Sequence, residues 1–299
     1  MKSIKIIFII LFLFIFSCSQ KFELGSKQNP VEMCFVPWME TGKIITRSKK
    51  LTNYLTEKTG YHFRITVPTN YAAVIEGMGT EEVDIAWLPP FAYILANEKY
   101  GAQVALTPVR KGMKKYKGEF LARSDSDIDN LADIEGKTIA YTDAASTSGY
   151  IYPSALLAQK GIKPGKIYFA GGHSQAILAV YQNRADVGCA YWSPPSKGEP
   201  QDGRKELLQT HPDIYKKTKI IGFTEWIMND TVTFRKDFPP EMKEKIVQAL
   251  IDYVNTEEGK IVMKKLYEID DYVRATDSDY DGVRKTLKTL GTDASQFIK

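Results

Sequence analysis

Two successive series of alternating strand-like and helical segments constrain this sequence more than any other feature. The first series begins at Val31 and reads strand, helix, strand, helix, strand, with a further short helix before a strand that ends at Pro108. The second series begins at Gly118 and carries four strand-like segments, the last ending at Tyr191, with helical segments between them. This order predicts open, mostly parallel sheets flanked by helices. In such sheets ligands bind beyond the carboxyl ends of the strands.

The pattern predicts two lobes of α/β structure. The expected strands are Val31–Val36, Phe63–Val67, Val83–Leu88, Gln103–Pro108, Gly118–Arg123, Lys137–Tyr141, Ile167–Ala170, Val187–Tyr191, Lys219–Phe223 and Thr231–Phe234. The expected helices include a segment that ends at Gly60, then Tyr71–Met78, Ala155–Lys160, Gln175–Asn183, a stripe of Met242, Ile246, Leu250 and Val254, and Tyr280–Leu290. We assign residues 31–112 plus 228–299 to lobe 1 and residues 113–227 to lobe 2. The two crossings between the lobes would form a hinge that closes around a ligand.

The first seventeen residues have the features of a secretory signal. A short basic start precedes an uninterrupted apolar run of eleven residues, Ile6–Phe16, which is too short to span a bilayer as a helix. The run ends in Ser17-Cys18, which resembles a bacterial lipobox, where the cysteine is lipidated and becomes the new N-terminus. We therefore expect an exported protein anchored to a bacterial membrane through Cys18, with residues 18–30 as a polar tether. The alternative is an ordinary secretory signal in which Cys18 is incidental.

Charge and cysteine usage exclude several classes of function. The formal net charge is only +4, so nothing in the composition calls for a nucleic-acid partner. Cys34 and Cys189 lie in separate strand-like runs, and we predict two separate buried thiols rather than a disulfide. No histidine accompanies them at a ligand spacing, so there is no zinc signature, and we expect neither a metal nor a cofactor.

One segment carries chemistry of its own. Three consecutive hydroxyl residues, Ser146-Thr147-Ser148, follow the strand Lys137–Tyr141 at the point where a helix must begin. Serine and threonine are good N-caps, and the first amides of a helix favour an anion. Gly149 would let the backbone approach a ligand closely. The alternative is a capped helix without any ligand.

Five segments, taken in order over residues 31–290, resemble the periplasmic phosphate-, phosphite- and phosphonate-binding proteins of ABC importers. They are Thr69–Met78, Val83–Pro90, Ser146–Tyr150 with Pro153, Ala170–His173, and Asn229-Asp230 followed by Val232–Lys236. The resemblance implies the type II periplasmic binding protein fold, in which two lobes and a hinge enclose the ligand. It also implies a monomer that works with an ABC permease and ATPase and is not an enzyme.

The resemblance assigns a set of residues to the ligand. They are Ser146, Thr147 and Ser148, which would bind the phosphoryl oxygens, together with His173, Asp230, Tyr71 and Tyr116. In this interpretation His173 donates to an oxygen, and the two tyrosines offer hydroxyl donors and apolar walls. An ionised Asp230 can only accept, so we expect a ligand that brings a proton and a site that rejects sulfate.

The sequence departs from the family pattern in three places and leaves other functions open. Thr231 follows the aspartate where proline is common, and Trp226-Ile227-Met228 replaces a proline-containing run. Tyr191-Trp192-Ser193 lacks the acids often found there, so we expect a ligand with a small uncharged substituent. A serine hydrolase is disfavoured because there is no Gly-x-Ser-x-Gly elbow. A sensor or surface antigen with the same fold, or a different small anion as ligand, remains an alternative.

Overall fold

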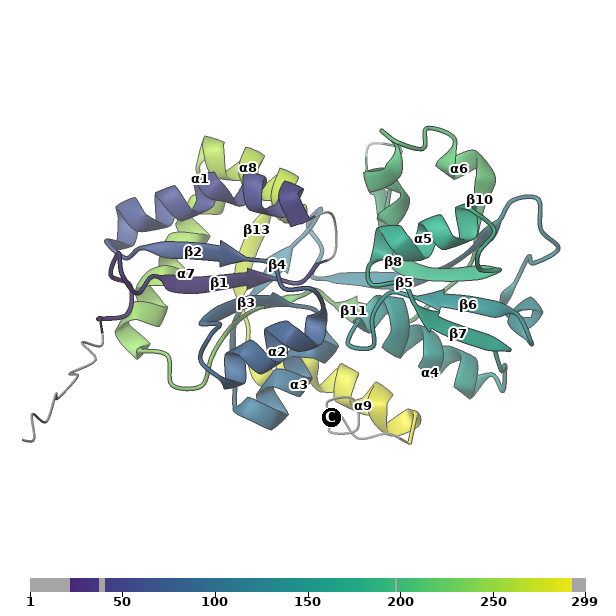
Figure 1. Ribbon diagram of the computed structural model, residues 1–299, viewed down its shortest axis with the longest axis horizontal. Coiled ribbons are helices and arrows are strands. Elements are labelled where there is room, and N and C mark those ends of the chain that lie inside the picture. The colour runs from purple at the N-terminus through teal and green to yellow at the C-terminus, as the bar shows by residue number, and fades with distance from the viewer. Residues whose placement is uncertain (1–21, 38–40, 197, 292–299) are drawn as a thin grey trace, which may run out of the picture.

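The computed structural model describes residues 22–37, 41–196 and 198–291, and these form two sheets that make up the two halves of an elongated molecule (Figure 1). The first sheet has the order β13-β4-β12-β3-β1-β2, with β1 at Val31–Phe35, β2 at Phe63–Thr66, β3 at Ile85–Leu88, β4 at Gln103–Val109, β12 at Thr231–Phe234 and β13 at Asp271–Arg274. The second has the order β10-β5-β8-β6-β7, with β5 at Lys115–Arg123, β6 at Thr138–Tyr141, β7 at Lys166–Phe169, β8 at Val187–Ser196 and β10 at Thr218–Phe223. Two short strands extend it, β9 (Glu199–Asp202) beside β8 and β11 (Ile227–Met228) beside β5. All ten predicted strands are present, whereas β9, β11 and β13 were not predicted.

Helices cover both faces of each sheet. Their bounds are α1 Thr41–Thr59, α2 Tyr71–Gly79, α3 Pro90–Tyr100, α4 Tyr152–Gln159, α5 His173–Tyr181, α6 Ile214–Lys217, α7 Pro240–Asn255, α8 Glu257–Tyr267 and α9 Asp281–Thr289. Short helical turns lie at η1 (Leu131–Ile134), η2 (Thr147–Ile151), η3 (Gly203–Leu207) and η4 (Asp277–Tyr280). Apolar side chains of α1, α7 and α8 pack on one face of the first sheet, and those of α2, α3 and α9 pack on the other. In the second sheet α4 covers one face, and α5 with η3 covers the opposite face.

The core contains the residues that periodicity selected. The stripe that was predicted after Pro239-Pro240 is the buried face of α7. Four of its residues are spaced so that they share one helix face, and all four pack into the same cluster as β1 and β12. Cys34 and Cys189 are separate buried thiols, as predicted.

Both sheets are mixed, and the expectation of mostly parallel sheets is wrong on this point. β1 pairs in parallel with β2 and β3, and β6 pairs in parallel with β7 and β8, as strand–helix–strand units require. In contrast, β12 is antiparallel to β3 and β4, and β5 is antiparallel to β8 and β10. These are the strands through which the chain enters each sheet from the other one. Because they start at the edge where the parallel strands end, they must run in the opposite direction.

Two neighbouring segments connect the sheets, one between β4 and β5 and the other between β10 and β12. β11 pairs with the start of β5. The Asn229 N–H donates to the Lys114 carbonyl at 2.7 Å, and the Asn229 side-chain amide donates to the carbonyls of Pro108 and Met113 at 2.9 Å each. One asparagine therefore fixes the outgoing and the returning segment to each other.

Candidate ligand-binding site

A cavity of about 70 Å³ lies between the two sheets. Val36 and Pro89 follow the parallel strands β1 and β3 of the first sheet, and Ser146 follows β6 of the second. The cavity is therefore at the carboxyl ends of parallel strands, where open α/β sheets bind ligands. Its volume is several times that needed for one water. The lining residues are Val36, Tyr71, Pro89, Arg110, Tyr116, Ser146, Ser148, His173, Tyr191, Ser193, Asp230, Tyr267 and Glu268.

The hydroxyl segment forms a tight turn at the cavity wall. Ser146 is the N-cap of η2, a π-helical turn that leads into α4, and its Oγ accepts from the Gly149 N–H at 3.1 Å. This bond uses a lone pair of the hydroxyl oxygen, so the hydroxyl proton can still be donated to a ligand. A Cβ on Gly149 would lie 2.1 Å from Thr142 Oγ1, so only glycine allows this turn. Ser146 and Ser148, which we expect to bind the ligand, both line the cavity.

Thr147 does not reach the cavity. It is fully buried, and its Oγ1 accepts from the backbone N–H of Phe91, in the first turn of α3, at 2.8 Å. The side chain therefore turns away from its two serine neighbours and contacts a helix of the first sheet. Sequence reasoning treated the three hydroxyls alike, because nothing in the local pattern tells which ones face the ligand.

His173 begins α5 and its imidazole faces the cavity. Thr142 Oγ1 lies 3.1 Å from both the Cys189 carbonyl and His173 Nδ1. The hydroxyl has one proton and the carbonyl can only accept, so when both bonds form Nδ1 is the donor to Thr142. Neutral His173 then presents an unprotonated Nε2. Burial lowers the pKa of His173 to about 3, so the ring is neutral at pH 7. The Tyr191 ring packs edge-on against it at 5.2 Å.

The two predicted tyrosines supply neutral hydroxyls from opposite sides of the cavity. Tyr71 is the first residue of α2, which Asn70 caps by accepting from the Ala73 N–H at 2.9 Å. Tyr116 is on β5, and it lines the cavity together with Ser148. Burial raises the pKa of each phenol well above its ordinary value. Both therefore stay protonated and can donate to an anion.

Asp230, which we also expect to bind the ligand, lines the cavity and is paired with an arginine that sequence reasoning missed. Arg110 Nη2 lies 2.8 Å from Asp230 Oδ2. Arg110 Nε also donates to the Tyr267 carbonyl at 2.9 Å, and its guanidinium lies 4.9 Å from the centre of the Tyr267 ring. Arg110 follows β4 and belongs to no motif, so its position could not be inferred from spacing. The pair offsets the charge of Asp230 within the cavity wall.

Glu268 is the second charged residue of the cavity wall that the sequence did not reveal. It follows α8 with φ at 54°, a left-handed conformation that non-glycine residues seldom adopt. Its carboxylate lies 3.1 Å from Lys111 Nζ and 3.4 Å from Lys205 Nζ. Burial alone would raise its pKa, but the two lysines outweigh it and the pKa is lowered, so Glu268 is ionised. Glu268 thus places a carboxylate in the cavity wall, although Tyr191-Trp192-Ser193 carries no acid.

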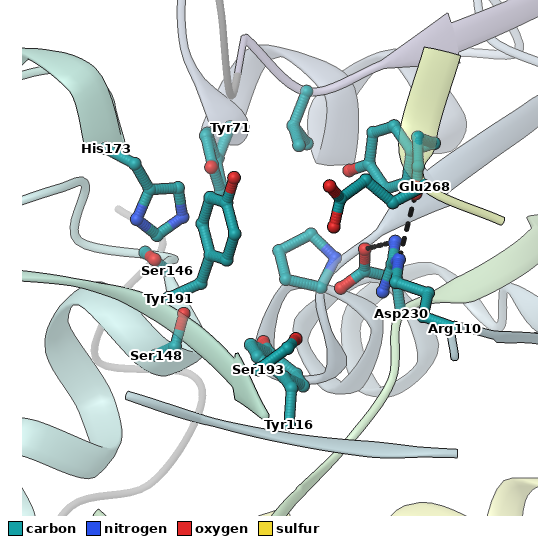
Figure 2. Close-up of a pocket in the computed structure, with 13 residues that line it drawn as sticks. Tyr71, Arg110, Tyr116, Ser146, Ser148, His173, Tyr191, Ser193, Asp230 and Glu268 are labelled. Carbon is teal, nitrogen blue, oxygen red and sulfur yellow. Dashed lines mark hydrogen bonds and ion pairs between the residues drawn. The ribbon is translucent and has the colours of Figure 1, made fainter. Parts of the chain in front are cut away.

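The cavity has two chemically different ends. Figure 2 shows His173, Ser146 and Ser148 together on one side and Arg110, Asp230 and Glu268 on the other. The first end offers hydroxyl donors, which suit an oxyanion, and the Nε2 of His173, which accepts. The second end consists of ion pairs. Six of the seven residues assigned to the ligand from the sequence line this cavity, and Thr147 is the exception.

Known proteins share this architecture and part of this sequence. Residues 33–280 match the family described as "ABC transporter, phosphonate, periplasmic substrate-binding protein". The chain belongs to this family. It is similar to the phosphate-import protein PhnD of Mycolicibacterium smegmatis, with 29% identity over 88% of this chain and 86% of that protein. It also resembles the phosphonates-binding periplasmic protein of Escherichia coli, with 28% identity over 70% of this chain and 62% of that protein. A binding protein of an ABC phosphonate transporter from Pseudomonas aeruginosa has the same fold, with a TM-score of 0.77, 22% identity and 87% of each chain covered.

Membership of the family settles the general role and compartment. Proteins of this family are substrate-binding components of ABC transporters and act outside the cytoplasm. Among residues 22–37, 41–196 and 198–291, no helix is long and apolar enough to cross a bilayer. The same residues include no cluster of His, Cys, Asp or Glu side chains suited to a metal ion. The proposed lipidation site, Cys18, lies outside the described residues.

Proposed function

We propose that this protein captures a small phosphorus oxyanion, namely a phosphonate, phosphite or phosphate, between two lobes and delivers it to the permease of an ABC importer. The observation that carries the proposal is the donor-rich end of the cavity, which the elements of two sheets build together. The names of the relatives support the ligand class, since one is a phosphate-import protein and another binds phosphonates. A binding role fits this site better than hydrolysis, because its hydroxyls are arranged as donors around a space.

Ser146, Ser148, Tyr71 and Tyr116 would donate to the phosphoryl oxygens. The residues that carry these hydroxyls all line the cavity. The two serines belong to one turn, with Ser146 as the N-cap of η2 and Ser148 within it. Hydrogen bonds from neutral hydroxyls to a charged acceptor are among the stronger kinds in proteins. Because these hydroxyls are buried, water does not compete with the ligand for their hydrogen bonds. Their number and placement favour an anion with several oxygens over a monovalent halide.

Two groups on the wall accept rather than donate, and they would select a ligand that carries a proton. One is the unprotonated Nε2 of His173, and the other is the carboxylate of Asp230. A P–OH group can donate to either acceptor, whereas sulfate near neutral pH carries no proton and would place a bare oxygen against it. Arg110 lowers the repulsion from Asp230 but leaves the mismatch in hydrogen bonding. We therefore retain the expectation that sulfate binds poorly.

The lobes would be residues 31–112 plus 228–299 and residues 113–227, hinged at the paired connecting segments. The hydrogen bonds of Asn229 support this location, because they join the two segments where the chain passes between the sheets. We further propose a monomer that docks on the permease of a transporter with an ATPase. Lipidation at Cys18 would hold it at the outer side of a bacterial membrane.

Isothermal titration with methylphosphonate, phosphite, inorganic phosphate and sulfate tests the proposal. At least one phosphorus oxyanion should bind, and at 100 times its Kd it should stabilise the fold by about 2.7 kcal/mol. Sulfate should bind much more weakly. If sulfate binds as well as the best phosphorus oxyanion, or if no phosphorus oxyanion binds at millimolar concentration, the proposal is wrong.

The variant that tests the site is Ser148→Ala. It removes one donor to a charged acceptor, which is worth roughly 1.5–3 kcal/mol, or about 10- to 150-fold in affinity. Ser154→Ala serves as the comparison, because Ser154 donates to the Ile151 carbonyl at 3.0 Å in α4 and does not line the cavity. Equal binding by both variants would show that the ligand sits elsewhere.

A further inference from the structure

A carboxylate points into the cavity from the side that faces the donor-rich end. In Figure 2 the Glu268 side chain extends toward the middle of the cavity, opposite His173 and Ser148. In the proposed binding mode the phosphoryl group lies at the donor-rich end, so the substituent of a phosphonate extends toward Glu268. A carboxylate without a partner at this position would favour a ligand that carries an ammonium group.

Two lysines contact the two oxygens of this carboxylate, and they come from different halves of the molecule. Lys111, which follows β4 of the first sheet, has its Nζ 3.1 Å from Glu268 Oε2. Lys205, in η3 of the second half, has its Nζ 3.4 Å from Glu268 Oε1. The Lys205 ammonium also donates to Gln201 Oε1 on β9 at 2.9 Å, so a second contact fixes its position. Each oxygen of the carboxylate therefore already has an ammonium beside it.

The three charged groups together are positive. Lys111 and Lys205 carry one positive charge each, whereas the ionised Glu268 carries one negative charge. The side chains of Lys111 and Glu268 are only 11% and 17% exposed, so water and salt screen their charges poorly. A further ammonium that a ligand brings to this carboxylate would meet two like charges as well as one opposite charge.

The neighbouring acids do not change this sign. Among the residues that the structure describes, three other acids near Glu268 each have cations of their own. The combinations are Asp230 with Arg110, Asp270 with Lys264, and Glu206 with Arg47 and Lys43 of α1. This end of the cavity is therefore unfavourable for a cationic substituent, although a carboxylate lines it.

We propose that Lys205 determines which substituent the cavity accepts, because its ammonium occupies the Glu268 carboxylate and excludes phosphonates that carry an ammonium of their own. The inference rests on the proposed function and deepens it, since it assigns the ligand to phosphorus oxyanions with an uncharged substituent or none. Like charges in a partly dry site repel strongly, and such mismatches are an effective source of specificity. Lys205 lies behind Glu268, outside the residues that line the cavity, and acts through that carboxylate as a positioning residue.

Two ligands of the same shape test the proposal. 2-Aminoethylphosphonate and propylphosphonate differ in whether an ammonium or a methyl group ends the chain, so the ratio of their affinities isolates the effect of charge. In calorimetric titration at pH 7.5 the wild type should bind propylphosphonate more tightly. In Lys205→Gln the ratio should shift toward 2-aminoethylphosphonate by roughly 5- to 50-fold, because one of the two like charges beside the carboxylate is gone. A wild type that prefers 2-aminoethylphosphonate, or an unchanged ratio in Lys205→Gln, would overturn the proposal.

Two further variants give the opposite shift and no shift. Glu268→Gln removes the negative charge and keeps both lysines, so the ratio should move away from 2-aminoethylphosphonate; a move toward it would refute the proposal. Lys219→Gln is the matched control, because Lys219 is also in the second half, is 28% exposed against 38% for Lys205, and pairs with Asp129 at 2.5 Å. It should leave the ratio unchanged. A shift as large as that of Lys205→Gln would mean that net charge, and not this site, sets the preference.

The design separates this inference from folding and from the proposed function. Both affinities are measured on the same protein, so a loss of stability in a variant cancels in their ratio. Aminomethylphosphonate and ethylphosphonate form a smaller pair with the same relation, and failure of both pairs to bind any variant that binds methylphosphonate would overturn the proposal. If no phosphorus oxyanion binds the wild type, the proposed function is wrong and this inference fails with it. If methylphosphonate binds and the ratio does not respond to Lys205→Gln, only this inference is wrong.

Discussion

Replacing Arg110 with glutamine should expose how far the cavity depends on the Arg110–Asp230 pair. The two side chains are only 13% and 11% exposed, and their charged atoms are 2.8 Å apart. Removing one partner of a buried pair leaves an uncompensated charge, which costs about 3–5 kcal/mol in comparable proteins. Arg110→Gln should therefore lower the free energy of unfolding by about that amount. Asp230→Asn alone should cost less, because Arg110 keeps its bond to the Tyr267 carbonyl and its ring contact.

The double variant makes the test decisive. In Arg110→Gln/Asp230→Asn neither charge remains, so the protein should be more stable than Arg110→Gln alone. Urea unfolding of the four proteins at pH 7.5 gives the coupling energy of the pair. Residues that do not interact give additive effects within about 0.5 kcal/mol. Additive costs would refute the view that the arginine exists to balance Asp230.

The same variant has a signature in binding. Without Arg110, the Asp230 carboxylate faces a bound anion with no cation beside it, and like charges in a partly dry site repel each other. Phosphonate affinity of Arg110→Gln should therefore fall, and Arg110→Gln/Asp230→Asn should bind better than Arg110→Gln. Calorimetric titration of both variants at pH 7.5 measures this difference, and equal affinities would contradict the argument.

Three further predictions concern other features of the chain. His173 has a pKa lowered to about 3 by burial, so the unfolded state binds more protons below its ordinary pKa of about 6.5, and stability should fall by about 1.4 kcal/mol at pH 5.5. Urea unfolding at pH 7.5 and 5.5 should show this loss in the wild type and not in His173→Gln; equal losses would refute it. Gly149→Ala should abolish methylphosphonate binding in calorimetry, because the added Cβ would lie 2.1 Å from Thr142 Oγ1 and the turn could not form. Normal affinity would show that the turn can adjust to a side chain at this position. Cys18→Ser should move the protein from the membrane to the soluble fraction on fractionation, and membrane association with no acyl label would count against lipidation.

Much of the architecture follows from the sequence, because local patterns carry it. Alternating strand-like runs predicted ten of the thirteen strands that the described residues form. An amphipathic stripe predicted the buried face of α7. The strand β13 was missed because Asp271–Arg274 is a short, charged edge strand without a buried run on both faces. The direction of β5 and β12 was also missed. Strand direction depends on the edge at which the chain enters a sheet, and a hydrophobic pattern has no information on that.

The residues of the candidate site also fall into those that local sequence patterns identify and those that only the tertiary structure brings to the cavity. Residues within one turn or strand end, such as Ser146, Ser148 and His173, could be found because hydroxyl caps and glycines mark the turns that present them. No local sequence pattern identifies Arg110 or Glu268. Each of them lines the cavity only because elements that are distant in the sequence pack together there. Thr147 is the clearest case. Its sequence neighbours gave it the role of a ligand donor, whereas the packing of α3 against η2 gave its hydroxyl a helix to cap. Local interactions determine which turn forms, and the docking of the two halves determines what each side chain of that turn meets.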